Sequence, residues 1–136
     1  MHTREFKPDE DVQMFVYGTL RTGWGNNRLF QNEHCEFVGA GRTKEVFTLR
    51  ASGIPFVNRD DPRHQVVGEV WSVKGRWVPQ VDQLESHPRW YKRELTTIIL
   101  DEGREVEAWL YFNPESHSPI VESGDFADTS RIRECC

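Results

Sequence analysis

One carboxylate near the middle of the chain is placed to act as a base. Glu85 follows Val81 by four residues, near the end of a run in which apolar residues recur at helical spacing. It therefore lies at the edge of the expected buried face. Partial burial raises the pKa of a carboxyl group and makes it a usable proton acceptor near neutral pH. Glu85 is the candidate general base, with a helix-end glutamate of no chemical role as the alternative.

Other polar groups surround this position in sequence. Asp82 lies one turn before Glu85 and competes for the same role, although its place on the helix predicts a solvated or helix-supporting side chain. Beyond the break at Pro88, the Tyr91 hydroxyl could orient a substrate. Arg93 could pair with a carboxylate in the core or in the substrate. A purely structural role is the alternative for both.

A second segment offers backbone donors instead of side chains. Phe15-Val16-Tyr17-Gly18-Thr19-Leu20 is an apolar strand that enters a glycine-containing turn. A chain that leaves a central strand through glycine can point successive N–H groups into one concavity, where they bind an oxyanion or a carboxylate. The alternative is an ordinary strand-to-loop turn. The substrate-binding residues predicted here are Tyr17, Gly18, Thr19 and Leu20, and Tyr91 joins them from the later segment.

Strands dominate the elements that must position these residues. A short helix is expected over 26–32, and a second helix is expected from Trp77, with Pro79 in its first turn and its end before Pro88. The predicted strands cover 13–17, 37–49 with a bend or bulge at its glycines, 55–57, 65–73, 94–100 and 104–112. The last two strands form a hairpin. The expected fold class is α+β, a small mixed β-barrel of about six strands with flanking short helices.

The length of 136 residues predicts one domain. We expect a loose lead-in over 1–11, a folded domain over 12–128 and a charged C-terminal tail over 129–136. The lead-in is polar and lacks the apolar core of a signal peptide.

Composition excludes several classes of partner. A net charge of -5 argues against a nucleic-acid or anionic-membrane surface, and the apolar runs are too short to span a bilayer. The three cysteines, Cys35, Cys135 and Cys136, form no disulfide framework, which predicts a reducing, cytoplasmic location. The five histidines are scattered without zinc-ligand spacing, so neither a metal nor a cofactor is expected.

Four short motifs occur in order between residues 13 and 128. They are Tyr17-Gly18-Thr19-Leu20, Gly68-Glu69-Val70-Trp71, Leu84-Glu85-Ser86-His87-Pro88-Arg89-Trp90-Tyr91-Lys92-Arg93 and Glu122-Ser123-Gly124-Asp125-Phe126. Together they resemble the signatures of the γ-glutamyl cyclotransferase-like family, in its γ-glutamylamine cyclotransferase and avirulence-induced-gene-like branch.

This resemblance implies a small β-barrel and a specific reaction. The α-amine of a γ-glutamyl group attacks its own γ-carbonyl, which forms 5-oxoproline and releases a free amine. Glu85 takes the place of the family's catalytic glutamate, and residues 17–20 take the place of its substrate-cradling loop. We favour small γ-glutamylamines over glutathione, because the chain is short and its motifs lie nearer that branch. The alternative is a non-catalytic small-molecule binding module that uses the same cradle.

One position departs from the family pattern. Ser86 stands where the family usually has glycine, so a positive φ there would strain the turn or shift Glu85. Trp24, Phe56 and Trp90 are candidates for lining the part of the pocket that holds the amine. The presence of Glu85 favours the enzyme over the binding module.

Overall fold

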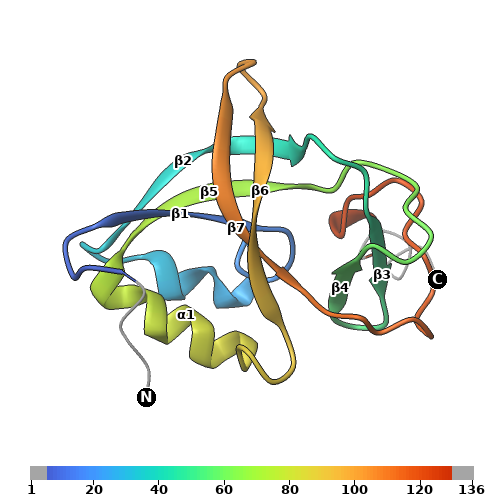
Figure 1. Ribbon diagram of the computed structural model, residues 1–136, viewed down its shortest axis with the longest axis horizontal. Coiled ribbons are helices and arrows are strands. Elements are labelled where there is room, and N and C mark those ends of the chain that lie inside the picture. Colours follow the sequence, from blue (N-terminus) through green and yellow to red (C-terminus); the bar gives the residue numbers. More distant parts are fainter. Residues whose placement is uncertain (1–5, 130–136) are drawn as a thin grey trace.

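Five strands close into a barrel in the order β1-β5-β2-β6-β7 in the computed structural model, which describes residues 6–129 (Figure 1). The strands are β1 (Asp11–Val16), β2 (Cys35–Thr43), β5 (Val67–Lys74), β6 (Lys92–Leu100) and β7 (Glu105–Phe112). β1 and β7 run parallel at the seam, and the other pairs are antiparallel. The prediction of a small mixed barrel is confirmed.

Two further strands form a separate antiparallel pair, β3 (Thr48–Ala51) and β4 (Pro55–Asn58), beside the barrel (Figure 1). The expected strand over 37–49 is therefore two elements. Its first part shifts register between Phe37 and Gly39, as a bulge at the glycine predicts. The chain then turns after Thr43, whose hydroxyl donates to the Glu45 carbonyl and accepts from the Val66 N–H. The barrel thus has five strands instead of about six.

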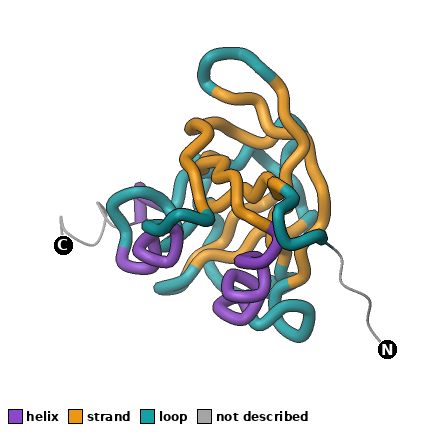
Figure 2. Tube along the Cα trace, turned by 90° about the vertical axis from the view of Figure 1, so that its left-hand side faces the viewer, coloured by secondary structure: helices purple, strands orange, loops and turns teal. Residues whose placement is uncertain are grey.

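The helices are short and lie outside the barrel (Figure 2). They are η1 (Gly25–Phe30), η2 (Gly75–Trp77) and α1 (Val78–Glu85), with a further helical turn over 127–129. Pro79 lies in the first turn of α1, where its missing N–H and fixed φ cost nothing. The Trp77 indole donates to the Leu29 carbonyl at 3.0 Å and joins this helical segment to η1.

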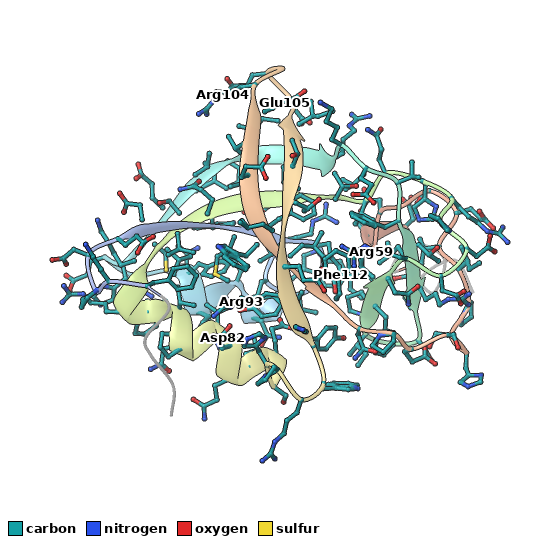
Figure 3. All side chains as sticks on the ribbon, in the orientation of Figure 1. Arg59, Asp82, Arg93, Arg104, Glu105 and Phe112 are labelled. Atoms are coloured by element: carbon teal, nitrogen blue, oxygen red, sulfur yellow. The ribbon has the colours of Figure 1, made fainter. Side chains whose placement is uncertain are left out.

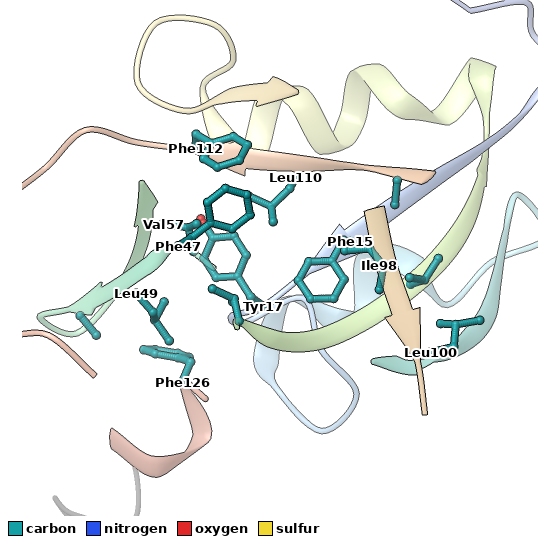
Figure 4. Close-up of a cluster of buried hydrophobic side chains, with 14 residues drawn as sticks. Phe15, Tyr17, Phe47, Leu49, Val57, Ile98, Leu100, Leu110, Phe112 and Phe126 are labelled. Carbon is teal, nitrogen blue, oxygen red and sulfur yellow. The ribbon is translucent and has the colours of Figure 1, made fainter. Parts of the chain in front are cut away.

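The core consists of two clusters, and β5 contributes to both. Val70 faces the cluster inside the barrel, whereas Trp71 and Val73 face the cluster under α1. Side chains that alternate between two faces are typical of a strand, and the strand predicted over 65–73 is confirmed as β5. Figure 4 shows the first cluster, in which Phe15 and Leu110 from the barrel lie near Phe47 from the connection to β3.

The first described residues are attached to the barrel. The Phe6 ring lies edge-on to Trp109 with centroids 5.7 Å apart, and the Arg76 N–H donates to the Pro8 carbonyl at 3.0 Å. The expected lead-in is therefore joined to the barrel through Phe6 and Pro8, although residues 7–10 are exposed. Residues 1–5 and 130–136, which include Cys135 and Cys136, lie outside the described residues. Over 6–129, no helix is long and apolar enough to cross a membrane.

Candidate active site

The six residues predicted from sequence to form the site line one cavity of about 140 Å³. Residues 17–20 approach it from the end of β1, Glu85 approaches from the end of α1, and Tyr91 lies just before β6. The other lining residues are Phe15, Val16, Asn26, Ile54, Pro55, Leu84, Trp90 and Tyr111.

Glu85 is a partly buried carboxyl group at this cavity. The pKa of Glu85 is raised from its ordinary value of 4.5 to about 7. Burial is the main cause of this shift, and the nearby Asp82 carboxylate is the second. A carboxyl group with this pKa is poised to accept and return a proton near neutral pH.

Asp82, one turn before Glu85 on α1, is held in an ion pair with Arg93 (Figure 3). The Arg93 guanidinium donates to both of its carboxylate oxygens, at 2.9 and 3.0 Å, and the Tyr111 hydroxyl donates to it at 2.6 Å. Asp82 was expected to be solvated or helix-supporting, and the solvated alternative is wrong, because Arg93 reaches it from a strand distant in sequence. Of the two partners considered for Arg93, the structure shows the core carboxylate.

Arg93 itself is enclosed by the protein. It is 5% exposed, and its guanidinium carbon lies 5.0 Å from the Phe6 ring centroid and 5.1 Å from that of Trp109. This charge is compensated by Asp82 and by the two ring faces. The pair fixes the turn of α1 from which Glu85 projects.

The turn after Glu85 is left-handed at Ser86, with φ 55° and ψ 40°. The Ser86 N–H donates to the Gln83 carbonyl at 3.2 Å, and the His87 N–H donates to the Asp82 carbonyl at 2.9 Å. These two bonds form a Schellman motif, in which glycine is the preferred residue at this position. Ser86 therefore has the positive φ at which a serine strains the turn.

We predict that Ser86→Gly stabilises the protein by about 1 kcal/mol, because a left-handed L-residue costs about 1–2 kcal/mol and glycine loses part of that gain in the unfolded state. The change is expected to raise Tm by about 3 °C. Thermal unfolding followed by circular dichroism measures it. Ser86→Ala is the control, because alanine has the same backbone restriction. Equal Tm values for the two variants would contradict strain at this residue.

The carbonyl groups of three cradle residues accept hydrogen bonds. Those of Gly18 and Thr19 accept from the N–H groups of Arg21 and Asn26, each at 3.0 Å. The Leu20 carbonyl accepts from the side chain of an asparagine on η1, Asn27, at 2.8 Å. The orientation of each peptide unit in this loop is therefore fixed.

The N–H groups of the cradle, in contrast, are available to a ligand. Within the part of the chain that the structure describes, those of Gly18, Thr19 and Leu20 donate to no other residue. In a trans peptide the N–H points opposite to the carbonyl of the preceding residue, so the N–H groups of Thr19 and Leu20 point away from the partners of the Gly18 and Thr19 carbonyls.

Gly18 is required by a close contact. A Cβ atom at this position would lie 2.6 Å from Cγ of Pro55, so only glycine lets the cradle pack on β4. This contact joins the end of β1 to the two-stranded sheet and narrows that side of the cavity.

The hydroxyl groups of the two predicted tyrosines are already engaged in hydrogen bonds. The Tyr17 hydroxyl donates to the Tyr111 carbonyl and that of Tyr91 donates to the Pro55 carbonyl, both at 2.7 Å. Burial raises the pKa of each hydroxyl, and the carboxyl group of Glu85 adds to both shifts. Both residues hold the walls of the cavity, while a direct contact of either with substrate stays a prediction.

Several lining residues gave little signal in the sequence. Leu84 continues the helical spacing of apolar residues, yet it is 44% exposed at the cavity rim, because periodicity does not distinguish a core from a cavity wall. Trp90 lines the cavity, as considered. Trp24 instead packs on Phe126, with ring centroids 5.0 Å apart. Phe56 stacks behind Tyr91 and does not line the cavity either.

Among the residues that the structure describes, the cavity wall contains one acidic side chain and no basic one. Glu85 is the one carboxyl group among the lining residues, and they include no lysine or arginine. Ile54, Leu84 and Trp90 make its rim apolar and exposed. Among residues 6–129, no group of three or more histidine, cysteine, aspartate or glutamate side chains is placed to hold a metal ion.

Comparison with known proteins identifies relatives of this chain. The family model described as "Gamma-glutamyl cyclotransferase, AIG2-like" matches residues 14–128. A protein of Methanocaldococcus jannaschii with the provisional name gamma-glutamylcyclotransferase is 44% identical over 115 residues, which cover 85% of this chain and 95% of its own. The gamma-glutamylaminecyclotransferase of Bos taurus is 34% identical, over 82% of this chain and 74% of its own.

Solved structures show the same fold. The crystal structure of an AIG2-like protein from Mus musculus superposes with a TM-score of 0.74 and 28% identity, over 83% of this chain and 87% of that one. A Pyrococcus horikoshii protein of 20% identity superposes with a TM-score of 0.71, over 91% of this chain and 97% of its own.

Proposed function

Since the chain belongs to the gamma-glutamyl cyclotransferase, AIG2-like family, we propose that it is a γ-glutamylamine cyclotransferase that works without a cofactor. The observation that carries this proposal is the shared cavity, which is lined both by Glu85, with a pKa near neutrality, and by residues 18–20, whose N–H groups donate to no other described residue.

In the proposed reaction Glu85 moves a proton between two nitrogen atoms. The substrate α-ammonium gives a proton to the Glu85 carboxylate, and the free amine attacks the γ-carbonyl carbon. The resulting tetrahedral oxyanion collapses as the bond from that carbon to the leaving nitrogen breaks. Glu85 returns its proton to that nitrogen. The ring nitrogen, which still carries an extra proton after the attack, then gives it up through Glu85 to the released amine, so 5-oxoproline and an alkylammonium ion are formed and the charge of the substrate ammonium is conserved. Such proton transfer contributes about 10²–10⁴-fold.

The cradle supplies the electrostatic part of this mechanism. N–H groups aimed at a developing oxyanion stabilise it without a metal, and the same groups can hold the substrate α-carboxylate. Because the ring closes within one molecule, a cavity that holds the substrate folded supplies a further part of the rate.

The cavity wall supports amines over glutathione. Glutathione and γ-glutamyl amino acids carry a carboxylate close to the bond that breaks, and the wall offers that group no lysine or arginine. The rim of Ile54, Leu84 and Trp90 suits an apolar chain on the released amine.

The direct test is release of 5-oxoproline, measured by mass spectrometry, from γ-glutamyl alkylamines, γ-glutamyl-ε-lysine, γ-glutamyl amino acids and glutathione. We expect the highest kcat/KM with the amines. Product from glutathione alone would contradict the amine preference. If the folded protein releases no product from any of them, the non-catalytic binding module becomes the better interpretation.

The pH dependence of kcat/KM is expected to follow the ionisation of the Glu85 carboxyl group. Only the ionised carboxylate can accept the proton, so activity should rise with pH through about 7 and level off above it. Initial rates with one γ-glutamylamine over about pH 5 to 9 measure this limb. A midpoint near the ordinary value of 4.5 would show that the base is not desolvated.

A further inference from the structure

Two carboxylates hold the loop that follows the cradle, and neither lines the cavity. The first is Glu69 on β5. Its Oε1 atom accepts from the Thr22 N–H at 2.9 Å, from the Thr22 hydroxyl at 3.0 Å and from the Trp71 indole at 3.1 Å. One carboxylate oxygen thus joins the cradle loop to a central strand of the barrel.

The second carboxylate, Asp125, approaches from the C-terminal segment. Its Oδ1 atom accepts from Arg21 Nη1 at 2.7 Å and from the Ala127 N–H at 2.9 Å. The Arg21 and Asp125 side chains are mostly buried, and the neighbouring rings of Trp24 and Phe126 pack with centroids 5.0 Å apart. The loop is therefore held from both sides.

A backbone bond connects these contacts to the cradle. The Arg21 N–H donates to the Gly18 carbonyl at 3.0 Å, and that carbonyl belongs to the same planar peptide unit as the Thr19 N–H. A displacement of Arg21 would therefore rotate the peptide unit that carries the Thr19 N–H, and Thr19 lines the cavity.

We propose that Glu69 and Asp125 are positioning residues that fix the donors of the cradle through Thr22 and Arg21. This assigns a role to the two motifs, Gly68-Glu69-Val70-Trp71 and Glu122-Ser123-Gly124-Asp125-Phe126, that the mechanism itself does not use. The inference rests on the proposed function, because it concerns placement of the same N–H groups.

The test compares Glu69→Ala with Glu69→Gln. Alanine removes all three hydrogen bonds, and misplacement of a catalytic group by about 1 Å can cost about 10²-fold, so we expect kcat/KM to fall by about 10- to 100-fold. Glutamine keeps an oxygen that can accept the same bonds, and its kcat/KM should stay within about threefold of wild type.

The matched control is Glu107→Ala. Glu107 also accepts a hydrogen bond from a threonine hydroxyl, that of Thr97, but it lies on the β6–β7 hairpin and lines no part of the cavity. The Glu107→Ala substitution should leave kcat/KM unchanged. The pH limb assigned to Glu85 should stay near 7 in Glu69→Ala, because positioning of the cradle does not alter the base.

Two results would overturn the proposal. The first is a kcat/KM of Glu69→Ala within twofold of the wild-type value. The second is a kcat/KM of Glu69→Gln as low as that of Glu69→Ala, which would show that the charge of Glu69 matters and not its hydrogen-bond acceptance. Thermal unfolding verifies that each variant is folded. If Glu69→Ala does not fold, Arg21→Met tests the same loop from the Asp125 side, with the same expected loss.

The outcome can be separated from that of the proposed function. If wild type turns over γ-glutamylamines and Glu69→Ala is unchanged, only the positioning role fails. If wild type turns over nothing, the proposed function fails. The positioning role is then decided by titration of the 5-oxoproline molecule against the amide NMR signals of Thr19 and Leu20. Shifts in wild type that are weakened in Glu69→Ala would support it, and shifts equal in both proteins, or absent from wild type, would overturn it.

Discussion

Glu85→Gln should lower kcat for a γ-glutamylamine by about 10²–10⁴-fold, the contribution expected of a general base. Glutamine keeps the shape and volume of the side chain but cannot accept the proton of the substrate ammonium. The measurement is 5-oxoproline release at saturating substrate. Glu36→Gln, at an exposed position on β2 away from the cavity, is the matched control and should retain full activity. Turnover of Glu85→Gln at the wild-type rate would exclude Glu85 as the base.

The same substitution should stabilise the protein above pH 7. The pKa of Glu85 is about 7 in the folded state, against 4.5 ordinarily, so the folded protein holds the proton more tightly. Its unfolding free energy therefore falls as pH rises from about 4.5 to about 7, and the loss persists at higher pH. Removing the charge recovers at most about 3 kcal/mol. Thermal unfolding should show a Tm advantage for Glu85→Gln at about pH 8 that shrinks towards about pH 4.

Arg93→Met should lower the free energy of unfolding by about 3–5 kcal/mol, because it leaves the Asp82 carboxylate without its buried partner. The Arg93 and Asp82 side chains are 3% and 19% exposed, and two hydrogen bonds join them. Urea denaturation at neutral pH measures this loss. The double variant Asp82→Asn/Arg93→Met should recover part of the stability, because it buries no unpaired charge.

Arg104→Met provides the matched comparison. Arg104 pairs with Glu102 at the tip of the β6–β7 hairpin, far from Arg93 (Figure 3), where the two side chains are 56% and 61% exposed. Exposed pairs contribute about 0–1 kcal/mol, so this variant should unfold close to the wild-type urea concentration. Equal losses in the two methionine variants would show that the Asp82–Arg93 pair contributes no more than a surface pair.

The parts of the molecule that could be predicted from sequence are those with local signals. β5 could be predicted from the alternation of side chains along 65–73. The β6–β7 hairpin could be predicted from its turn, Asp101-Glu102-Gly103. Both signals act over a few residues. The helical spacing of Val81 and Glu85 placed the candidate base at the edge of a buried face for the same reason.

Long-range pairing could not be predicted in this way. The ion pair of Asp82 with Arg93 depends on how β6 crosses α1, and no local pattern contains that distance. Tyr111 and Pro55 belong to the cavity because β7 and β4 meet there, although each is an ordinary strand residue in sequence. The division of 37–49 into β2 and β3 likewise depends on the contacts of Thr43.

The parallel pairing of β1 with β7 affects how the protein folds while it is being synthesised. Met14 pairs with Trp109 and Phe15 with Leu110, so β1 gains its second neighbour only after β7 has left the ribosome. Until then β1 and β6 both present unpaired backbone edges, which are templates for association with other chains. We expect nascent chains that end before β7 to aggregate and to lack the cradle, since Tyr17 also needs the Tyr111 carbonyl. The cavity lined by Glu85 and the cradle therefore forms only when almost the whole described domain has emerged.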